Sequence, residues 1–497
     1  MKKANQFNLS RFFIHVFFII NFALSQNLIY PNNHTMPKNR IIFQFNNFIN
    51  KNTLSKSYNK SSTMSLSLNT NIALNNGHPN IDNQSEFYLA GSASKLNSLR
   101  FEYRKPWLFI EMEPYFSFHR KEKSVKTFDT WHSNNNYNLI SNKELTSGLK
   151  QSQIILHYKG FGIGYGHINH WWGLGFHSAI ALTSNSPSQE TYAFGTFKDI
   201  QFGKFSFGSK VIVMPYNNHF DIPIYFSGMN SHLTFSSDPK ITLGFFRTYL
   251  SGNFENLSEE TNLTSGWNIV DATMLVIEPL FGQSKKGLPY SVPGTPGYDP
   301  WNEILVGYIN LNFPEIFLDV YFELGSDDNR ANLTDLRAHW DHTLGYLIGF
   351  KKYHMLGNKA LLFGAEYLSL IKSNTEKFWR QYDYAYYTGS QYDYFTYKGR
   401  RMGGHSGSSS NDLIFLFGLG VPNQMILFTY NNEKHGLKNK TYPEVKREIN
   451  ITYNYKINDV HSLFLIFESE KINNYEYKVE NISRSKYLWI GFSLTIL

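Results

Sequence analysis

Residues 161–177 read FGIGYGHINHWWGLGFH, and the first half of this segment alternates a large side chain with glycine. A period of two is the geometry of a β-strand, because successive side chains point to opposite faces of the backbone. The large set, Phe161, Ile163 and Tyr165, suits an apolar surrounding, and the glycines suit a crowded interior. Together with the same alternation elsewhere, this pattern predicts an all-β fold, an antiparallel transmembrane β-barrel of the outer membrane.

The last strand predicted from the sequence shows the alternation again. One face carries Leu488, Ile490, Phe492, Leu494 and Ile496, and the other carries Trp489, Gly491, Ser493 and Thr495. About fifteen segments along the chain are strand candidates, many of them near the ten residues that a tilted strand needs to cross a bilayer. A strand at the end of the chain is typical of how such barrels close.

Composition supports a membrane barrel over a soluble exported domain. The chain is 42% apolar and 17% aromatic, with 33 Tyr and 42 Phe, which suits aromatic belts at both bilayer interfaces. Beyond the N-terminus no stretch is continuously apolar over the length of a spanning helix, which excludes a helical membrane protein. Cysteine is absent, so stability must come from something other than disulfides, and a closed sheet needs none.

The N-terminus predicts export. Lys2, Lys3 and Arg11 precede an apolar run at residues 12–20, and Ala23-Leu24-Ser25 offers a cleavage site of small residues. We therefore interpret residues 1–25 as a signal peptide, cleaved on the way to the outer membrane of a Gram-negative bacterium. An uncleaved anchor helix is the alternative, but Asn21 interrupts the apolar run too early for it.

Two further regions follow from the pattern. Residues 26–86 are polar, and we expect a disordered lead, a luminal plug or a first hairpin there. The hairpin is an alternative because apolar and polar side chains alternate at residues 64–68. Residues 87–497 form the barrel. Long polar connections stand beside short turns such as 420–424 and 458–461, which predicts long loops on one side of the barrel. The long ones are residues 120–150, 251–265, 281–301, 325–342 and 372–412.

The charge is modestly basic. The formal net charge is +8, and removing the three cations of the signal peptide leaves about +5. We expect contacts with outer-membrane lipid and with lipopolysaccharide phosphates, or alternatively an acidic partner such as an anionic polysaccharide. The compartment and the lack of a nucleic-acid module argue against nucleic acid. We expect a monomer.

The segment HWWGLGFHSAIALTSNSP at residues 170–187 resembles the capsule assembly protein family called Wzi. The matching residues are Trp171, Trp172, Gly173, Gly175, Ser184, Asn185 and Pro187. His170 stands where the family generally has Arg, and Leu174 where it generally has Pro. Residues 397–407 look like the family's late Gly-Arg, Gly-His loop, and residues 323–328, after a strand with Tyr321, resemble its acidic turn.

The resemblance implies a barrel of about eighteen strands that binds or organises surface polysaccharide as a lectin. It casts Trp171, Trp172, Gly173, Gly175 and Asn185 as structural, and it implies no cofactor. The alternative function is a porin-type channel for small solutes or sugars, because a barrel of this size has room for water unless a plug fills it.

Residues 378–405 supply the candidates for glycan contact. Aromatic faces match the apolar surfaces of sugars, and arginine can pair with the carboxylates of an acidic glycan. We predict binding by Trp379, Arg380, Tyr382, Tyr384, Tyr397, Arg400, Arg401 and His405. The alternatives are a tyrosine-rich strand end at the bilayer interface, and an ion-pair network of Arg400 and Arg401 with Asp327, Asp328 or Asp335.

The sequence predicts neither a metal site nor an enzyme. His167, His170 and His177 are clustered, but alternation places only His167 and His177 on one face, ten residues apart. We interpret His405 as a hydrogen-bonding residue of a glycine loop. Residues 404–408, GHSGS, lack the final glycine and the strand-to-helix context of a nucleophile elbow.

Overall fold

The structure is a computed structural model. It describes residues 37–52, 64–80, 82–87, 91–120, 145–216, 224–252, 302–327, 344–371, 386–387, 395–398, 400–437 and 440–496. The predicted signal peptide, residues 1–25, lies outside these ranges and stays a prediction.

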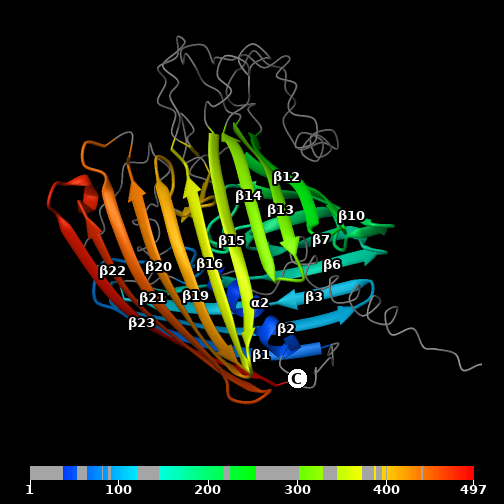
Figure 1. The fold of residues 1–497 in the computed structure, drawn as a ribbon, viewed down its shortest axis with the longest axis horizontal. Helices are drawn as coiled ribbons and strands as arrows, with labels where there is room; N and C mark the ends of the chain where they lie inside the picture. Colours follow the sequence, from blue (N-terminus) through cyan, green and yellow to red (C-terminus); the bar gives the residue numbers. More distant parts are fainter. Residues whose placement is uncertain are drawn as a thin grey trace, which may run out of the picture.

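A single antiparallel sheet of 21 strands closes on itself to form the barrel (Figure 1). Its members are β1 (Met64–Asn75), β2 (Ala93–Lys105), β3 (Leu108–Met112), β4 (Pro114–His119), β5 (Leu145–Leu149), β6 (Ser152–Tyr158), β7 (Phe161–Ile168), β8 (Gln189–Thr196), β9 (Ile200–Phe202), β10 (Phe205–Tyr216), β11 (Ile224–Phe235), β12 (Lys240–Gly252), β13 (Asn302–Phe313), β14 (Leu318–Asp327), β15 (Leu344–Leu356), β16 (Lys359–Ser369), β19 (Asn411–Val421), β20 (Gln424–His435), β21 (Glu444–Lys456), β22 (His461–Asn473) and β23 (Ile482–Thr495).

Three of the barrel strands are interrupted. β3 and β4 both pair with β2, β5 and β6 continue the next strand, and β8 and β9 both pair with β10. Counted as continuous crossings, the strands of the described residues number eighteen, as the family resemblance implied. Pairing of β1 with β23 closes the barrel. A two-stranded ribbon, β17 (Thr396–Tyr397) with β18 (Arg400–Arg401), is separate, and η4 (Tyr475–Tyr477) precedes β23.

The predicted alternation holds in β7 and β23. Phe161 and Ile163 are 47% and 56% exposed on the outer face, where lipid would cover them. Gly164 faces inward, and a Cβ there would lie 3.1 Å from the ring of Phe197. In β23, Leu488 and the alternate residues after it face outward, while Trp489 is buried inside. The all-β transmembrane barrel is therefore confirmed.

The two ends of the barrel differ as predicted. Short turns, such as residues 159–160, 357–358 and 422–423, join strands at the end where β23 finishes and the C-terminus is marked in Figure 1. The long connections, such as residues 253–301 and 370–410, join strands at the opposite end. In outer-membrane barrels the short turns face the periplasm and the long loops face outside.

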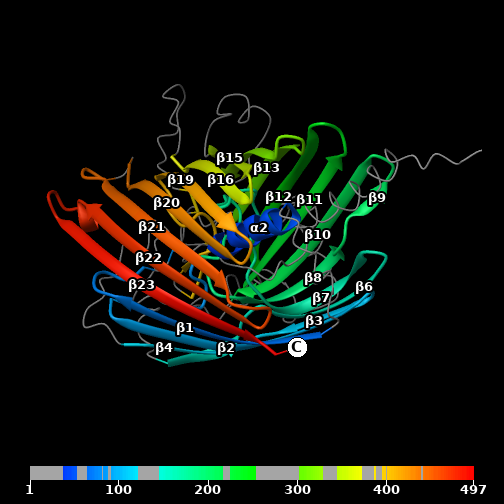
Figure 2. The same ribbon diagram turned by 60° about the horizontal axis from the view of Figure 1, so that its bottom comes forward.

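The barrel begins earlier than residue 87, where we predicted its start. β1 begins at Met64 and pairs with both β2 and β23, because its alternating residues continue well past residue 68. Before it, helix α2 (Pro37–Asn52) lies within the ring of strands (Figure 2). Phe45 and Ile49 are buried against β19, where Gly418 and Gly420 leave room for their side chains. Residues 26–86 thus supply both a luminal helix and a first strand.

Described residues from several parts of the chain pack together in the interior. One buried apolar cluster joins α2, the barrel wall and segments that enter from the long-loop end, including Trp172, Ile180, Tyr387 and Met402. Within the described residues, no helix is long and apolar enough to cross a bilayer. Glu323, predicted to begin an acidic turn, instead lies in β14 with its side chain buried inside, since the alternation of that strand continues to Asp327.

Candidate functional site

Two segments fold into the barrel from the long-loop end. The first inward segment, residues 169–188, joins β7 to β8, and the second inward segment comprises the described residues 395–398 and 400–410, before β19. They bond to each other directly. Thr183 N donates to Met402 O at 2.7 Å, and Asn185 Nδ2 donates to Arg401 O at 3.0 Å. Asn185, a predicted structural residue, therefore joins the two segments.

Two buried carboxylates of the wall hold the first inward segment. Glu323 on β14 accepts hydrogen bonds from Leu174 N and Ile180 N, and Glu366 on β16 accepts them from Phe176 N and Ser178 N, both at 2.7 Å. Tyr321 Oη also donates to Glu366, at 2.8 Å. These carboxylates satisfy backbone donors that would otherwise be buried without partners.

Glycine makes that close approach feasible. A Cβ on Gly173 would lie 2.8 Å from Glu323 Oε1, and a Cβ on Gly175 would lie 2.8 Å from Glu366 Oε2. Any side chain at these positions would push the backbone away from the carboxylates. The structure thus gives a physical reason for the structural role predicted for Gly173 and Gly175.

The paired tryptophans occupy different environments. Trp172 is 3% exposed, stacks on Phe246 of β12 and lies against Gly228 of β11. Trp171 is partly exposed. Trp172 therefore carries most of the packing between the first inward segment and the wall.

The loop that carries Arg400 and Arg401, both predicted as glycan contacts, is buried. Both side chains are 3% exposed. Arg400 donates to Ser85 O, and Arg401 donates to His405 O and to Gly404 O. Gly407 has a positive φ of 76° and lies against the Arg401 guanidinium, so this bend depends on glycine.

The remaining predicted contact residues are only partly placed. Tyr397 is half-buried, and its ring lies 5.1 Å from the ammonium of Lys398. Trp379, Arg380, Tyr382 and Tyr384 lie outside the described residues, as do Asp328 and Asp335. Asp327 accepts a hydrogen bond from Tyr387 N at 2.7 Å.

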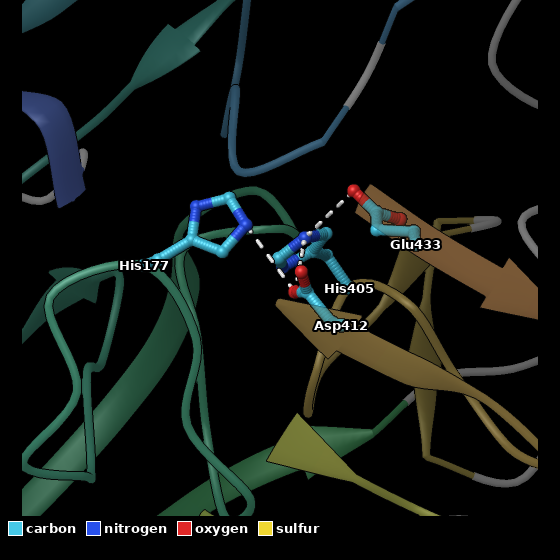
Figure 3. A group of neighbouring side chains, drawn as sticks. All are labelled: His177, His405, Asp412 and Glu433. Carbon is cyan, nitrogen blue, oxygen red and sulfur yellow. Dashed lines mark ion pairs between the residues drawn. The ribbon is translucent and has the colours of Figure 1, made fainter. Parts of the chain in front are cut away.

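A polar cluster lies where the two inward segments meet the wall (Figure 3). It consists of His177 from the first segment, His405 from the second, Asp412 of β19 and Glu433 of β20. Asp412 Oδ2 lies 3.2 Å from His177 Nε2 and 3.3 Å from His405 Nε2, and Glu433 Oε1 lies 3.5 Å from His405 Nε2. We refer to these four residues as the His-carboxylate cluster.

Neighbouring charges shift the pKa values of groups in and beside the cluster. Burial alone would lower the pKa of His405, but the neighbouring carboxylates of Asp412 and Glu433 raise it to about 10. Next to the cluster, Lys446 Nζ lies 3.2 Å from Glu433 Oε1 and 2.7 Å from Asp82 Oδ2. Those contacts lower the pKa of Asp82 against the opposing effect of its burial.

A second acidic group adjoins the first on β21 and β22. Glu448, Glu468 and Glu470 offer carboxylate oxygens within 4.8 Å of one another. Glu468 accepts hydrogen bonds from Asn80, Asn450 and Tyr487, each at 2.7 Å. Glu468 and its three donors therefore form a hydrogen-bonded network that supports the wall.

Sequence reasoning missed the carboxylates of these groups. Their signal was present, because charged residues recur two apart on the inward faces of strands, as in Lys446 with Glu448 and Glu468 with Glu470. What could not be read from the sequence is that residue 177 meets residues 405, 412 and 433 in space.

Comparison with known proteins gives a likeness of fold. The Escherichia coli protein Wzi, described as an outer-membrane, carbohydrate-binding β-barrel involved in group 1 capsule assembly, is 12% identical and superimposes with a TM-score of 0.56, covering 86% of this chain and 84% of its own. The chain has the fold of an outer-membrane barrel.

Two further solved structures superimpose less well. Acinetobacter baumannii OccAB4 is 12% identical with a TM-score of 0.43, covering 88% of this chain and all of its own length. Pseudomonas aeruginosa OccK7 (OpdD) is 8% identical with a TM-score of 0.46, covering 87% and 99%. No family model and no curated protein matches the sequence.

Proposed function

We propose that this protein associates with polysaccharide at the cell surface and does not act as a diffusion channel. The observation that carries the proposal is the filled lumen. Helix α2 lies inside near the short-turn end, and the two inward segments cross the interior near the other, all within one buried apolar cluster. A barrel of eighteen strands otherwise leaves an aqueous channel.

The likeness to Wzi supports the same proposal. That protein is described as a carbohydrate-binding barrel of capsule assembly. The match covers most of both chains, and the residues of this chain that resemble the family's motif, Trp172, Gly173, Gly175 and Asn185, form the bonds and packing of the first inward segment. A shared interior would give the two proteins a similar closed lumen.

Glycan contact is assigned to the aromatic and basic residues of the long-loop end. Trp379, Arg380, Tyr382 and Tyr384 bring stacking faces and a guanidinium together in one short stretch of sequence. Tyr397 keeps part of its ring accessible. Arg400, Arg401 and His405 stay predicted as glycan contacts; in the structure each is 3% exposed, and Arg400 and Arg401 bond to the backbone oxygens of Ser85 and His405.

Conductance and glycan retention together test the proposal. Purified barrel in planar bilayers should give negligible steps, and the same preparation should be retained on a column of immobilised acidic capsular polysaccharide. Large, open steps without retention would establish the porin instead. Neither conductance nor retention on any surface glycan tested would leave a structural surface protein, which also contradicts the proposal.

A residue-level test uses a matched tyrosine. Trp379→Ala combined with Tyr382→Ala should weaken retention on the column without changing heat-modifiable gel migration. Tyr442→Ala is the control, because Tyr442 is an exposed aromatic in a connection at the same end of the barrel. Equal retention of both variants would show that the aromatic stretch at residues 379–384 does not bind the glycan.

A further inference from the structure

We propose that the His-carboxylate cluster is a binding site for one divalent transition-metal ion, with zinc the preferred ion. The ligands would be His177 Nε2, His405 Nε2, Asp412 Oδ2 and Glu433 Oε1, the four residues drawn in Figure 3. This inference does not depend on the proposed function. It concerns how the inward segments are attached to the barrel wall.

The spacing of the four atoms fits tetrahedral coordination. Zinc binds imidazole nitrogen and carboxylate oxygen at about 2.0–2.2 Å, and at the tetrahedral angle this places neighbouring ligand atoms about 3.3–3.6 Å apart. The observed separations are 3.2 Å, 3.3 Å and 3.5 Å, from His177 to Asp412, His405 to Asp412 and His405 to Glu433. All four atoms lie within 4.8 Å of one another.

Unsatisfied polar atoms point to a missing partner. His405 and Asp412 have side chains that are 1% and 2% exposed. Yet His405 Nε2 and both Asp412 oxygens have no hydrogen-bond partner, although Asp412 Oδ2 lies 3.2 Å from His177 Nε2 and 3.3 Å from His405 Nε2. Buried polar atoms are nearly always bonded, and an ion shared by these atoms would supply the partner that they lack.

The charge of the surrounding wall also favours a cation. The inward faces of β19 to β22 carry Asp412, Glu433, Glu448, Glu468 and Glu470. Against them, in the described part of these strands, stands the ammonium of Lys446, which contacts Glu433, Glu448 and Glu470. A divalent ion would offset the excess negative charge in this buried region.

Neighbouring side chains are placed to orient the ligands. His435 Nε2 lies 3.0 Å from Glu433 Oε2, the oxygen that would not bind the ion, and so fixes the carboxylate. Asn431 Nδ2 lies 2.6 Å from His177 Nε2, while Asn431 Oδ1 has no partner. Asn431 Nδ2 also donates to Glu433 Oε1 at 3.1 Å, so a half-turn of the Asn431 amide would turn the free oxygen toward the ion at the cost of that bond.

Metal on His405 Nε2 would leave the imidazole proton on Nδ1. Asn83 Nδ2 lies 3.1 Å from this nitrogen, and Asn83 Oδ1 has no partner. A half-turn of the Asn83 amide would let Oδ1 accept the proton, at the cost of its bond to His177 O. Metal loading should therefore be accompanied by a small local rearrangement at Asn83.

The site would act as a clamp between parts of the chain that are distant in sequence. One ligand comes from each inward segment and two come from adjacent wall strands. An ion bound there would fix both segments against β19 and β20 at once. The stabilisation follows from binding the folded barrel and not the unfolded chain.

Metal analysis of the full-length barrel tests the proposal. Protein purified in detergent without chelator, or stripped and reloaded with Zn²⁺, should contain about one zinc per chain by elemental mass spectrometry. Reloading with Co²⁺ should give the visible absorption of a tetrahedral cobalt site. Chelation should lower the temperature at which gel migration changes, and Zn²⁺ should restore it.

Variants assign the ligands. His177→Ala and Asp412→Asn should lose the bound metal; His177 is partly exposed, so its removal should leave a folded, heat-modifiable barrel. The control is His232→Gln, which alters another buried histidine, 3.1 Å from Asp199 and away from the cluster. Wild-type protein that takes up neither Zn²⁺ nor Co²⁺, or full metal retention by both ligand variants, would overturn the proposal.

Discussion

At the scale of single residues, the fit between glycine and a large neighbour determines where the interior can close. Trp172 is 3% exposed, and a Cβ on Gly228 would lie 2.7 Å from its ring. The indole thus occupies space that a missing side chain leaves on β11. The packing is specific to this ring, because a smaller side chain would leave a cavity between the first inward segment and the wall.

Trp172→Ala should lower the free energy of unfolding by about 3–5 kcal/mol, the usual cost of removing a buried large aromatic ring. Trp171→Ala should cost less, because Trp171 is partly exposed. Heat-modifiable migration and urea unfolding in detergent would measure both. Equal losses in the two variants would contradict the assignment of the packing to Trp172.

His170 gives a dependence on pH. Its burial and the nearby charge of Lys210 lower its pKa from 6.5 to about 3. The unfolded chain therefore takes up a proton first, so His170 has no effect on stability above pH 6.5 and increasingly destabilises the fold as the pH falls toward 3. His170→Gln should lose less stability than the wild type over that interval.

The exposed His354 on β15 provides the matched control for that pH series. Unfolding of wild type, His170→Gln and His354→Gln would be followed from neutral to acid pH in the same detergent. Parallel acid losses in wild type and His170→Gln would rule out a contribution of His170.

Sequence reasoning was reliable for the direction of side chains and weak for their partners. Alternation placed Ile490 and Trp489 on opposite faces, as the structure has them, because that pattern depends only on neighbouring residues. It could not place Arg401, whose side chain is buried under the bend at Gly407 and whose carbonyl oxygen bonds Asn185. A glycine-rich sequence indicates a bend without saying whether the bend faces solvent or the lumen.

At the scale of elements, the first inward segment depends on carboxylates supplied by β14 and β16. The sequence identified Glu323 within a family-like motif but assigned it to a turn, since acidic residues near glycine are typical of turns. Glu366 carried no signal at all. Both are needed because the segment buries backbone donors that no strand or helix satisfies.

Glu366→Ala should destabilise the barrel by about 1–3 kcal/mol for each buried N–H left without a partner. Hydrogen exchange at residues 176–178 should also become faster, because Phe176 N and Ser178 N lose their acceptor. Glu190→Ala is the control, since its bonds to Tyr165 and Tyr192 are exposed. Unchanged exchange at residues 176–178 would show that the carboxylate does not hold the segment.

The outer face of β21 to β23 carries a row of cations near the long-loop end. Arg447 lies opposite Lys471, which lies opposite Arg484, and Ile451, Phe467 and Leu488 form an apolar row further along the strands. Like charges directly opposite each other destabilise a sheet. No described carboxylate pairs with these three, so an anion from the outer leaflet is the expected counter-charge.

We predict that this row contacts lipopolysaccharide phosphates. Arg447→Gln with Arg484→Gln should reduce the lipopolysaccharide that copurifies with the barrel, while Lys352→Gln with Lys359→Gln, near the short-turn end, should not. Phosphate and lipid analysis of the wild type and the two double variants would measure the lipopolysaccharide bound to each. Equal lipopolysaccharide in all three would show that the row has no such partner.

At the scale of the whole molecule, the strand count shows which strands the alternation of side chains does not predict. About fifteen candidates were visible, and the resemblance to a family implied about eighteen. β1 was obscured by a polar composition, because Thr70 takes the outward position between Leu68 and Ile72 and most of the inward positions are Ser or Asn. Its place in the sheet comes from pairing with β23 at the opposite end of the sequence, which closure requires and local pattern does not reveal.

The lumen holds chain at two levels along its length, α2 toward the short-turn end and the inward segments beyond it. Under the proposed function each level blocks ions, so removing one should leave the other as a barrier. Phe45→Asp with Ile49→Asp should detach α2 from Gly418 and Gly420, because a buried carboxylate against an apolar wall is costly. Conductance in planar bilayers should stay near that of the wild type.

Conductance should also stay near that of the wild type in Glu323→Gln with Glu366→Gln, because this pair of substitutions loosens only the first inward segment. Combining all four substitutions should produce open steps, because both barriers are then weakened in one molecule. Asn47→Asp, on the exposed face of α2, controls for added charge on the helix. If the α2 variant alone conducts fully, the inward segments are no barrier, and the closed lumen on which the polysaccharide proposal depends would rest on the helix alone.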